Sequence, residues 1–283
     1  KQWNTDSYYV DYQEMLYNEK IDILSVCTHL DSHEEIINTA VECGVKSIFC
    51  EKPISGSLAS AQKIVTQCKS QDIKLAVNHS RRWDEFFSSL KIDIEKGKFG
   101  KIQHANFYYT RGIANSGSHL FDLLRFLFGE IVSIYTHYSI SELEGDPTLS
   151  CTLEMEDGLI CNLVGLDGRY YRIFDLEIFG TNSKILIDTS KNIKYFSSQP
   201  SRRSSEFNEL YDDSYSFSKK QESQIFISSL SNIIDAIEGK TNVKCTGVDG
   251  YKSLELIIAA KLSYELKQKV DLPLNKEYHD YSI

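Results

Sequence analysis

The feature that most constrains the fold is the alternation of apolar strands and amphipathic helices in the first hundred residues. Short apolar runs at residues 21–27, 45–50 and 74–77 predict three buried parallel strands. Helical patterns stand between these runs, and strands joined through helices form a parallel sheet with the helices packed over it. We therefore predict a parallel α/β domain over residues 1–99.

Local signals place the helices of this domain. A short helix is expected at residues 12–18. Ser32, followed three positions later by Glu35, has the pattern of a capping box and predicts the start of the next helix. Ser57 begins a third helix, whose apolar residues share one face, and residues 82–95 form a fourth.

The pattern changes after residue 100, where strands follow one another with few helices between them. A strand at residues 102–110 precedes a single helix with a leucine core stripe. Further strand-like runs occupy residues 131–140, 149–155, 159–164, 171–179 and 184–188. Consecutive strands of this kind indicate a large, open, mostly antiparallel sheet, so we predict an α+β domain over residues 100–283.

The last third of the chain contains one poorly periodic segment and two helices. Residues 190–223 are rich in Ser and Tyr and are predicted to be irregular. The first helix that follows has an apolar stripe of Ile227, Leu230, Ile234 and Ile237. The second helix, at residues 250–267, is apolar almost all round, as a buried helix is.

Composition and charge limit the functions open to this chain. Its 283 residues carry a formal net charge of −9 and no basic stripe, which argues against a nucleic-acid surface. No apolar run approaches the roughly 20 residues that span a bilayer, and the polar N-terminus does not have the pattern of a signal peptide. Four cysteines in strand-like runs are expected to be buried thiols in a reducing cytoplasm. They are Cys27, Cys50, Cys151 and Cys161.

One charged tripeptide stands just after a predicted parallel strand. Glu51, Lys52 and Pro53 follow the second strand, and ligands of such sheets bind outside the carboxyl ends of the strands. Lys52 is thus positioned to act on a bound small molecule. Taken alone, Lys52 is better interpreted as a solvated loop lysine. A second motif makes the functional interpretation the better one.

The second motif begins the helix of the second domain. His119 and Asp122 are three positions apart and share a helix face, away from the leucine stripe. A polar pair at a helix N-terminus can line a cleft between domains, and a histidine suits proton transfer near neutral pH. Without the lysine motif, a surface histidine beside an incidental carboxylate is the better interpretation.

Together these motifs resemble the Gfo/Idh/MocA family of oxidoreductases, and the resemblance extends over nearly the whole chain. The strand-end Thr28, the tripeptide at residues 51–53, the pair Arg81 and Arg82, and the Gly-x-His-x-x-Asp helix at residues 117–122 occur in the family's order. The resemblance implies a partial Rossmann-type domain for NAD or NADP. It also implies a second domain whose open antiparallel sheet contributes substrate contacts and an oligomer interface.

The family mechanism implies a role for each motif. Lys52 would hydrogen-bond the reacting hydroxyl and stabilise the alkoxide that forms, and His119 would take the hydroxyl proton. The residues expected to contact or orient the substrate are Asn115, Asp122 and Arg82. Those expected to line the cofactor are Thr28, His33, Glu51, Lys52 and Pro53. The implied reaction is hydride transfer between NAD(P) and a ring hydroxyl or ketone of a sugar or sugar-nucleotide.

The chain departs from the family pattern at three places. Asn115 stands where the family usually has an aspartate, so His119 alone would handle the proton. His29 and Leu30 replace the common Pro-Asn pair after Thr28. No G-x-G-x-x-G loop precedes the first predicted strand, so the chain as given is expected to bind the dinucleotide weakly or not at all.

These departures leave an alternative open, in which the chain has lost cofactor binding and acts as a sugar-binding, regulatory or scaffold protein. A metal site is not expected, because His29 and His33 have i, i+4 spacing but no further ligand cluster. The sheet between residues 131 and 188 has more strands than the helices can cover. A homodimer or homotetramer formed through this partly apolar sheet face is therefore predicted.

Overall fold

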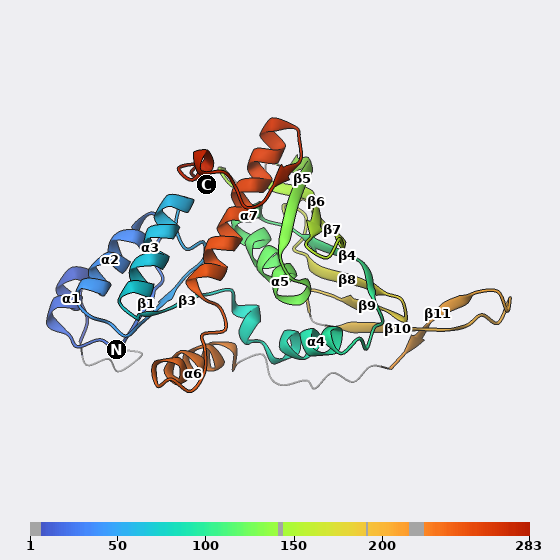
Figure 1. The fold of residues 1–283 in the computed structure, drawn as a ribbon, viewed down its shortest axis with the longest axis horizontal. Coiled ribbons are helices and arrows are strands. Elements are labelled where there is room, and N and C mark those ends of the chain that lie inside the picture. Colours follow the sequence, from blue (N-terminus) through green and yellow to red (C-terminus); the bar gives the residue numbers. More distant parts are fainter. Residues whose placement is uncertain (1–6, 141–143, 191, 215–223) are drawn as a thin grey trace.

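The computed structural model describes residues 7–140, 144–190, 192–214 and 224–283. Their strands form two sheets, one of three strands and one of nine. The long helix α7 (Gly247–Leu266) lies between the two sheets and packs against elements of both (Figure 1). The predicted buried helix at residues 250–267 is thus confirmed, and it starts three residues earlier than expected.

The smaller sheet is parallel, with its strands in the order β1–β2–β3. These strands are β1 (Ile23–Val26), β2 (Ser47–Cys50) and β3 (Lys74–Val77). The helices that accompany them are α1 (Tyr12–Asn18), α2 (His33–Glu42) and α3 (Leu58–Ser70). All four residues of β2 are buried, which explains why the strand has a continuous apolar pattern. The predicted parallel sheet is confirmed.

The start of α2 differs from the expected capping box. Ser32 has helical backbone angles, and its hydroxyl donates to Thr28 Oγ1 and to the carbonyl oxygen of His29, each at 2.8 Å. A capping serine instead adopts extended backbone angles and accepts from the first turn. The capping box between Ser32 and Glu35 is therefore wrong, and the Ser32 hydroxyl ties down the loop that follows β1.

The larger sheet has its described strands in the order β11–β10–β9–β8–β4–β7–β6–β5–β12. They are β4 (Ile102–Tyr109), β5 (Ile131–Ile140), β6 (Thr148–Met155), β7 (Ile160–Gly165), β8 (Phe174–Gly180), β9 (Ser183–Ile187), β10 (Ile193–Pro200), β11 (Asn208–Asp213) and β12 (Val270–Asp271). Strands β4 and β7 pair in parallel, and the other neighbouring pairs are antiparallel. The predicted open, mostly antiparallel sheet is confirmed.

Strands β10 and β11 were not expected, because they lie within the segment predicted to be irregular, residues 190–223. They form an antiparallel hairpin that extends the sheet beyond β9 (Figure 1). Most of their side chains are half-buried or exposed, so the strands lack the apolar alternation that marks a strand in the sequence. Residue 191 and residues 215–223 of that segment lie outside the described residues.

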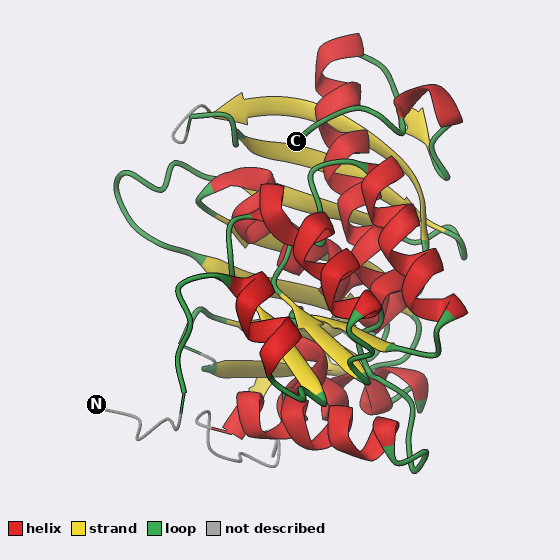
Figure 2. Ribbon diagram, turned by 90° about the vertical axis from the view of Figure 1, so that its left-hand side faces the viewer, coloured by secondary structure: helices red, strands yellow, loops and turns green. Residues whose placement is uncertain are grey.

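Helices lie in front of the strands of the larger sheet in Figure 2. A π-helical turn (Gly112–Gly117) leads into α5 (Ser118–Phe128), which packs on α7, and α7 packs on β5. Helix α4 (Glu85–Glu95) begins after residue 82, because Asp84 accepts a hydrogen bond from the backbone of Phe86 and caps it. Short 3-10 turns occur at Leu30–Ser32, Ser80–Trp83 and Lys276–Tyr278.

Most of the predicted apolar stripe of α6 (Ile225–Ile237) is exposed, and only Ile237 of its four residues packs against the core. Ile227 is 63% exposed and Leu230 is 43% exposed, whereas the buried residues of the helix are Ser229, Ile233 and Ala236. Helix α6 packs against β3 and the turn that holds Trp83, whose indole Nε1 donates to Asn232 Oδ1 at 3.0 Å. Its inward face therefore combines the apolar Ile233 with the small residues Ser229 and Ala236.

All seven cysteines are free thiols. Cys50, Cys151 and Cys161 are buried, as their strand-like surroundings predict. Cys27 is exposed, which contradicts the expectation, because β1 ends at Val26 and Cys27 already belongs to the loop. Within the described ranges, every helix is too short or too polar to cross a bilayer.

Candidate active site

The candidate site lies where the parallel strands end. Because β1, β2 and β3 run in the same direction, the loops that follow them meet at one edge of the sheet. This edge gathers Thr28 from the first loop, Glu51 and Lys52 from the second, and Asn78 and His79 from the third. The Asn78 amide donates to Glu51 Oε1 at 2.6 Å and links two of these loops.

Lys52 connects this edge to the second domain. Its ammonium donates to the carbonyl oxygen of Asn115 at 2.7 Å and to Asn115 Oδ1 at 3.1 Å. Burial lowers the pKa of Lys52, and the charges of Glu51 and Asp146 oppose this shift. Lys52 is therefore a half-buried donor directed at the segment that carries His119.

The π-helical turn before α5 is held by Asp146, a carboxylate that no sequence motif identified. Its two oxygens accept from the backbone of Ala114 at 2.8 Å and of Asn115 at 2.9 Å. Gly112 has a φ of 78°, and a Cβ added there would lie 2.0 Å from Asp146 Oδ2. Glycine is required at this position, and Asp146 fixes the backbone that presents Asn115 to Lys52.

His119 occupies the first turn of α5 and faces a second histidine. The rings of His119 and His79 meet edge to face, with their centroids 5.7 Å apart. In both rings the Nδ1 atom is buried and has no hydrogen-bond partner within the described part of the chain. Burial lowers the pKa of His119 well below its ordinary value, and the charges of Arg81 and Lys52 act in the same direction. His119 is therefore neutral near neutral pH and able to accept a proton.

Asp122 and Arg82 are paired with each other. Asp122 is 1% exposed, and Arg82 Nε donates to both of its oxygens at 3.0 Å. The same guanidinium reaches Asp249 of α7 at 2.9 Å. A substrate contact by Asp122 or Arg82 stays a prediction. Both side chains are engaged in a buried ion pair that joins the third loop of the parallel sheet to α5 and α7.

Removing the carboxylate of this pair is expected to destabilise the fold. In the variant Asp122→Ala the Arg82 guanidinium loses its principal counter-ion, and breaking a buried ion pair costs about 3–5 kcal/mol. Urea denaturation measures the free energy of unfolding, with Glu95→Ala as the control, since Glu95 pairs with Lys91 on an exposed helix face. A decrease in the free energy of unfolding of Asp122→Ala no larger than that of the control would contradict this account.

The two remaining residues of the first loop behave differently. Thr28 is exposed at the sheet edge, where it can contact a ligand. His33 is 1% exposed, and its ring nitrogens lie 3.2 Å from the Thr28 carbonyl oxygen and 3.3 Å from the Ile54 carbonyl oxygen. The His33 ring is buried between two loops and links them, and its contact with the cofactor stays a prediction.

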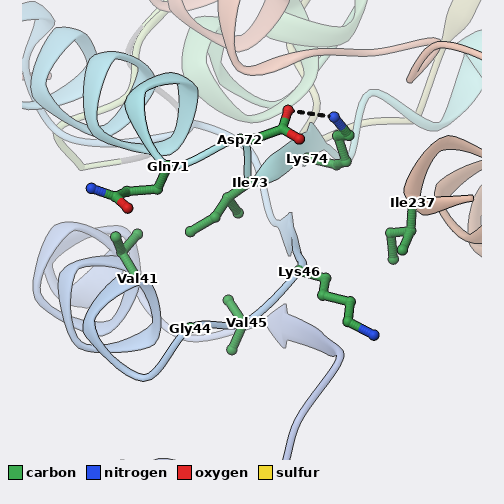
Figure 3. A pocket seen from close by; sticks show the side chains of 9 residues that line it. All are labelled: Val41, Gly44, Val45, Lys46, Gln71, Asp72, Ile73, Lys74 and Ile237. Carbon is green, nitrogen blue, oxygen red and sulfur yellow. Dashed lines mark hydrogen bonds and ion pairs between the residues drawn. The ribbon is translucent and has the colours of Figure 1, made fainter. Parts of the chain in front are cut away.

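Another hollow lies at the opposite edge of the parallel sheet. It has a volume of about 350 Å³ and is lined at the amino ends of β2 and β3 by Lys46 and Lys74, among others (Figure 3). Both lysines are ion-paired, Lys46 with Asp22 at 2.7 Å and Lys74 with Asp72 at 2.6 Å. The hollow contains no residue of the sequence motifs. Within the described ranges, no group of three or more His, Cys, Asp or Glu side chains could hold a metal ion.

Comparison with known protein families connects this geometry to an activity. Residues 1–79 match an oxidoreductase family described as an NAD-binding Rossmann fold, and residues 112–272 match the C-terminal alpha/beta domain of that family. The chain belongs to the Gfo/Idh/MocA oxidoreductase family. The predicted oxidoreductase activity and nicotinamide cofactor are confirmed at the level of this family. The domain boundary at residue 100 stays a prediction.

Relatives of this Gfo/Idh/MocA chain include named dehydrogenases. It is 26% identical over 293 residues to myo-inositol 2-dehydrogenase of Thermotoga maritima, covering 93% of this chain and 84% of the relative. It is 28% identical over 305 residues to scyllo-inositol 2-dehydrogenase (NAD(+)) of Bacillus subtilis, covering 98% and 84%. The solved complex of levoglucosan dehydrogenase with NADH and levoglucosan has the same fold, with a TM-score of 0.79, 16% identity, and coverage of 94% and 84%.

Proposed function

We propose that the chain transfers a hydride between NAD or NADP and a ring hydroxyl, or the corresponding ketone, of a sugar or sugar-nucleotide. The observation that carries the proposal is the convergence of two complementary groups from different domains. The Lys52 ammonium is bound to Asn115, one helical turn before His119, and burial keeps His119 in its neutral form. Relatives named for inositol and for levoglucosan support a polyhydroxylated ring as the substrate.

Lys52 would act as the hydrogen-bond donor to the reacting oxygen. As the C–H bond breaks, negative charge develops on that oxygen, and a fixed cation stabilises it most in the transition state. The Asn115 carbonyl and side-chain oxygens hold the ammonium in place. When substrate binds, one ammonium hydrogen remains for the sugar, because a lysine has three donors.

His119 would accept the hydroxyl proton. Its buried, neutral ring has an unpartnered nitrogen, and the charge of Lys52 disfavours the imidazolium until a negative alkoxide approaches. In the reverse direction the same imidazolium would return the proton to the ketone oxygen. His79, against which the ring packs edge to face, would hold the orientation of His119.

The edge of the parallel sheet fits a nicotinamide dinucleotide, which would supply or accept the hydride when bound. The buried Asn78 Oδ1 and His79 Nδ1 atoms have no partner among the described residues, so polar groups of a ligand can pair with them. Thr28, Glu51 and Lys52 stand at the same edge and would contact the nicotinamide ribose.

Asp146 is expected to tune Lys52 without touching the substrate. In Asp146→Asn the loss of negative charge further lowers the pKa of Lys52, so the alkaline limb of the kcat/KM profile moves to lower pH. The kcat is expected to fall about tenfold, because the Asn115 backbone loses a charged acceptor. Glu144→Gln, an exposed carboxylate in the same loop, is the control. An unchanged alkaline limb in Asp146→Asn would argue against this role.

We further propose that the helix-free face of the larger sheet forms a homodimer or homotetramer. Tyr138 of β5 is 60% exposed and Ile160 of β7 is 40% exposed on this face, and exposed apolar groups of this size favour burial by another subunit. Light scattering is expected to give a dimer or tetramer for the wild type and a shift toward monomer for Ile160→Glu. The control is Ile92→Glu on α4. A wild-type monomer at high concentration would contradict the proposal.

The experiment that tests the proposed function is a turnover screen. Because the chain is expected to bind the dinucleotide weakly, the protein is mixed with a large excess of NAD or NADP and with a panel of sugars, sugar-nucleotides and inositols. Formation of the reduced nicotinamide is followed by its near-ultraviolet absorbance. Turnover of at least one compound that vanishes in Lys52→Ala supports the proposal. Calorimetric binding of a sugar without any turnover would instead favour a sugar-binding protein that has lost its reaction.

A further inference from the structure

Among the described residues, Arg81 at the candidate site has no counter-ion. It follows β3 in the Ser80–Trp83 turn, at the same sheet edge as Lys52. Its guanidinium carbon lies 3.7 Å from the centre of the Phe174 ring. No ion pair or side-chain hydrogen bond joins its guanidinium to another residue in the described ranges.

The adjacent Arg82, in the same turn, has carboxylate partners for its guanidinium. Arg82 is paired with Asp122 and Asp249 at about the distance of a direct hydrogen bond, 3.0 Å and 2.9 Å. The two carboxylates whose charge acts on Arg81 are Asp84 and Asp122, and both are committed elsewhere. Asp84 caps α4, and Asp122 binds Arg82. Among the described residues, the hydrogen-bond donors of Arg81 are therefore left for a ligand.

The environment of Arg81 is costly for a free cation. Arg81 is half-buried, and this burial lowers its pKa to about 10, because a cation partly withdrawn from water without a partner is unfavourable. Its charge also lowers the pKa of both His119 and Lys52, which shows that it acts on the same centre. A bound anion would compensate this charge at the place where the sugar is proposed to react.

A second feature of the site agrees with a negatively charged ligand. Asn115, which contacts Lys52 directly, has a neutral amide side chain. A carboxylate at this position would repel an anionic substrate, whereas the neutral amide does not. The neutral Asn115 and the cation Arg81 thus both favour a negatively charged ligand.

On the basis of the function proposed above, we infer that the substrate is a sugar acid, whose carboxylate Arg81 binds beside the reacting hydroxyl. A planar guanidinium matches a carboxylate with two parallel N–H···O bonds. The ring of Phe174 covers one face of the guanidinium, which holds its plane and leaves the donors at its edge available. The ligand class is therefore a uronate, free or attached to a nucleotide.

Matched pairs of ligands test this inference by calorimetry, in the presence and absence of NADH. The pairs are D-glucuronate with D-glucose, D-galacturonate with D-galactose, and UDP-glucuronate with UDP-glucose. The wild type is expected to bind at least one acid more than about tenfold tighter than its neutral partner. Arg81→Gln is expected to lower the affinity for that acid by about 10- to 100-fold and the affinity for its neutral partner by less than about twofold. Arg81→Lys should recover part of the loss, because it keeps the charge without the fork.

Arg172→Gln is the matched control, since Arg172 is an exposed arginine two positions before Phe174. Thermal melting of each variant verifies that it is folded. Equal binding of acids and neutral sugars by the wild type, or an unchanged preference in Arg81→Gln, overturns the inference. The inference is also overturned if Arg81→Gln binds NADPH more weakly than the wild type but binds NADH equally well. Arg81 would then bind the extra phosphate of the cofactor. Turnover of neutral sugars in preference to acids rejects this inference but leaves the proposed function intact, whereas failure of every sugar to bind or react rejects both.

Discussion

Replacing Lys52 with alanine is expected to lower kcat by about 10²- to 10³-fold and to change the KM for the sugar far less. The ammonium is anchored by the carbonyl and side-chain oxygens of Asn115, so its position is fixed before the substrate arrives. A preorganised donor contributes most when charge develops on the reacting oxygen, and its loss therefore appears mainly in kcat.

Steady-state kinetics with the preferred sugar measure this effect. Lys63→Ala is the control, because Lys63 is an exposed lysine on α3 whose side chain is 71% accessible. Lys52→Arg separates charge from geometry, since it keeps a cation but changes the shape of the donor. Near-normal kcat in Lys52→Ala would remove Lys52 from the mechanism.

Replacing His119 with alanine is expected to lower kcat by about 10²- to 10⁴-fold, the usual contribution of a general base. The pH dependence has a definite sign. Burial lowers the pKa of His119 well below 6.5, so the neutral, proton-accepting form persists below that pH. Wild-type activity should therefore stay constant as the pH falls through 6.5 and decline only in the more acidic range.

In His119→Ala this acid limb should disappear, and activity should recover in part at high pH, where hydroxide can take the proton. His137→Ala is the control, because His137 is exposed on the larger sheet and bonds Thr152 at 2.8 Å. A variant of His119 that keeps the wild-type acid limb would assign that limb to another group. His79 is the nearest candidate, since burial lowers its pKa as well.

How well each element could be predicted depends on where its side chains are buried. The strands of the parallel sheet are covered by helices, so β2 is a continuous apolar run in the sequence. Strands β10 and β11 have no such pattern, because their side chains are half-buried at the edge of the larger sheet. The stripe of α6 was identified correctly as apolar, but periodicity cannot say whether an apolar face meets the core or the surface.

In the candidate site, too, some residues could be predicted from the sequence and others could not. Lys52 could be placed from the sequence, because the end of a buried strand fixes where the next residues lie. Asp146 could not, since its contact with Asn115 joins residues 31 positions apart and depends on the path of a loop. The Asp-Pro pair in that loop and the glycine at position 112 were the available signals, and neither is specific alone.

The paired arginines illustrate a further limit. Sequence alone cannot say which of two adjacent residues in a turn points inward, because a small change in backbone angle exchanges their directions. In the structure Arg82 pairs with the buried Asp122, and Arg81 is left beside the ring of Phe174. The substrate contact assigned to Arg82 from the motif therefore passes to its neighbour under the inference drawn above.

Transfer of a labelled hydride tests the central claim most directly. A sugar acid or sugar that supports turnover is prepared with deuterium at the carbon that bears the reacting hydroxyl, and the reduced nicotinamide is analysed by mass spectrometry. The account predicts that the deuterium moves from carbon to the nicotinamide ring, and that Lys52→Ala and His119→Ala each slow this transfer at least about 100-fold. Deuterium that stays on the sugar or is lost to water, or transfer that proceeds normally in both variants, would contradict it.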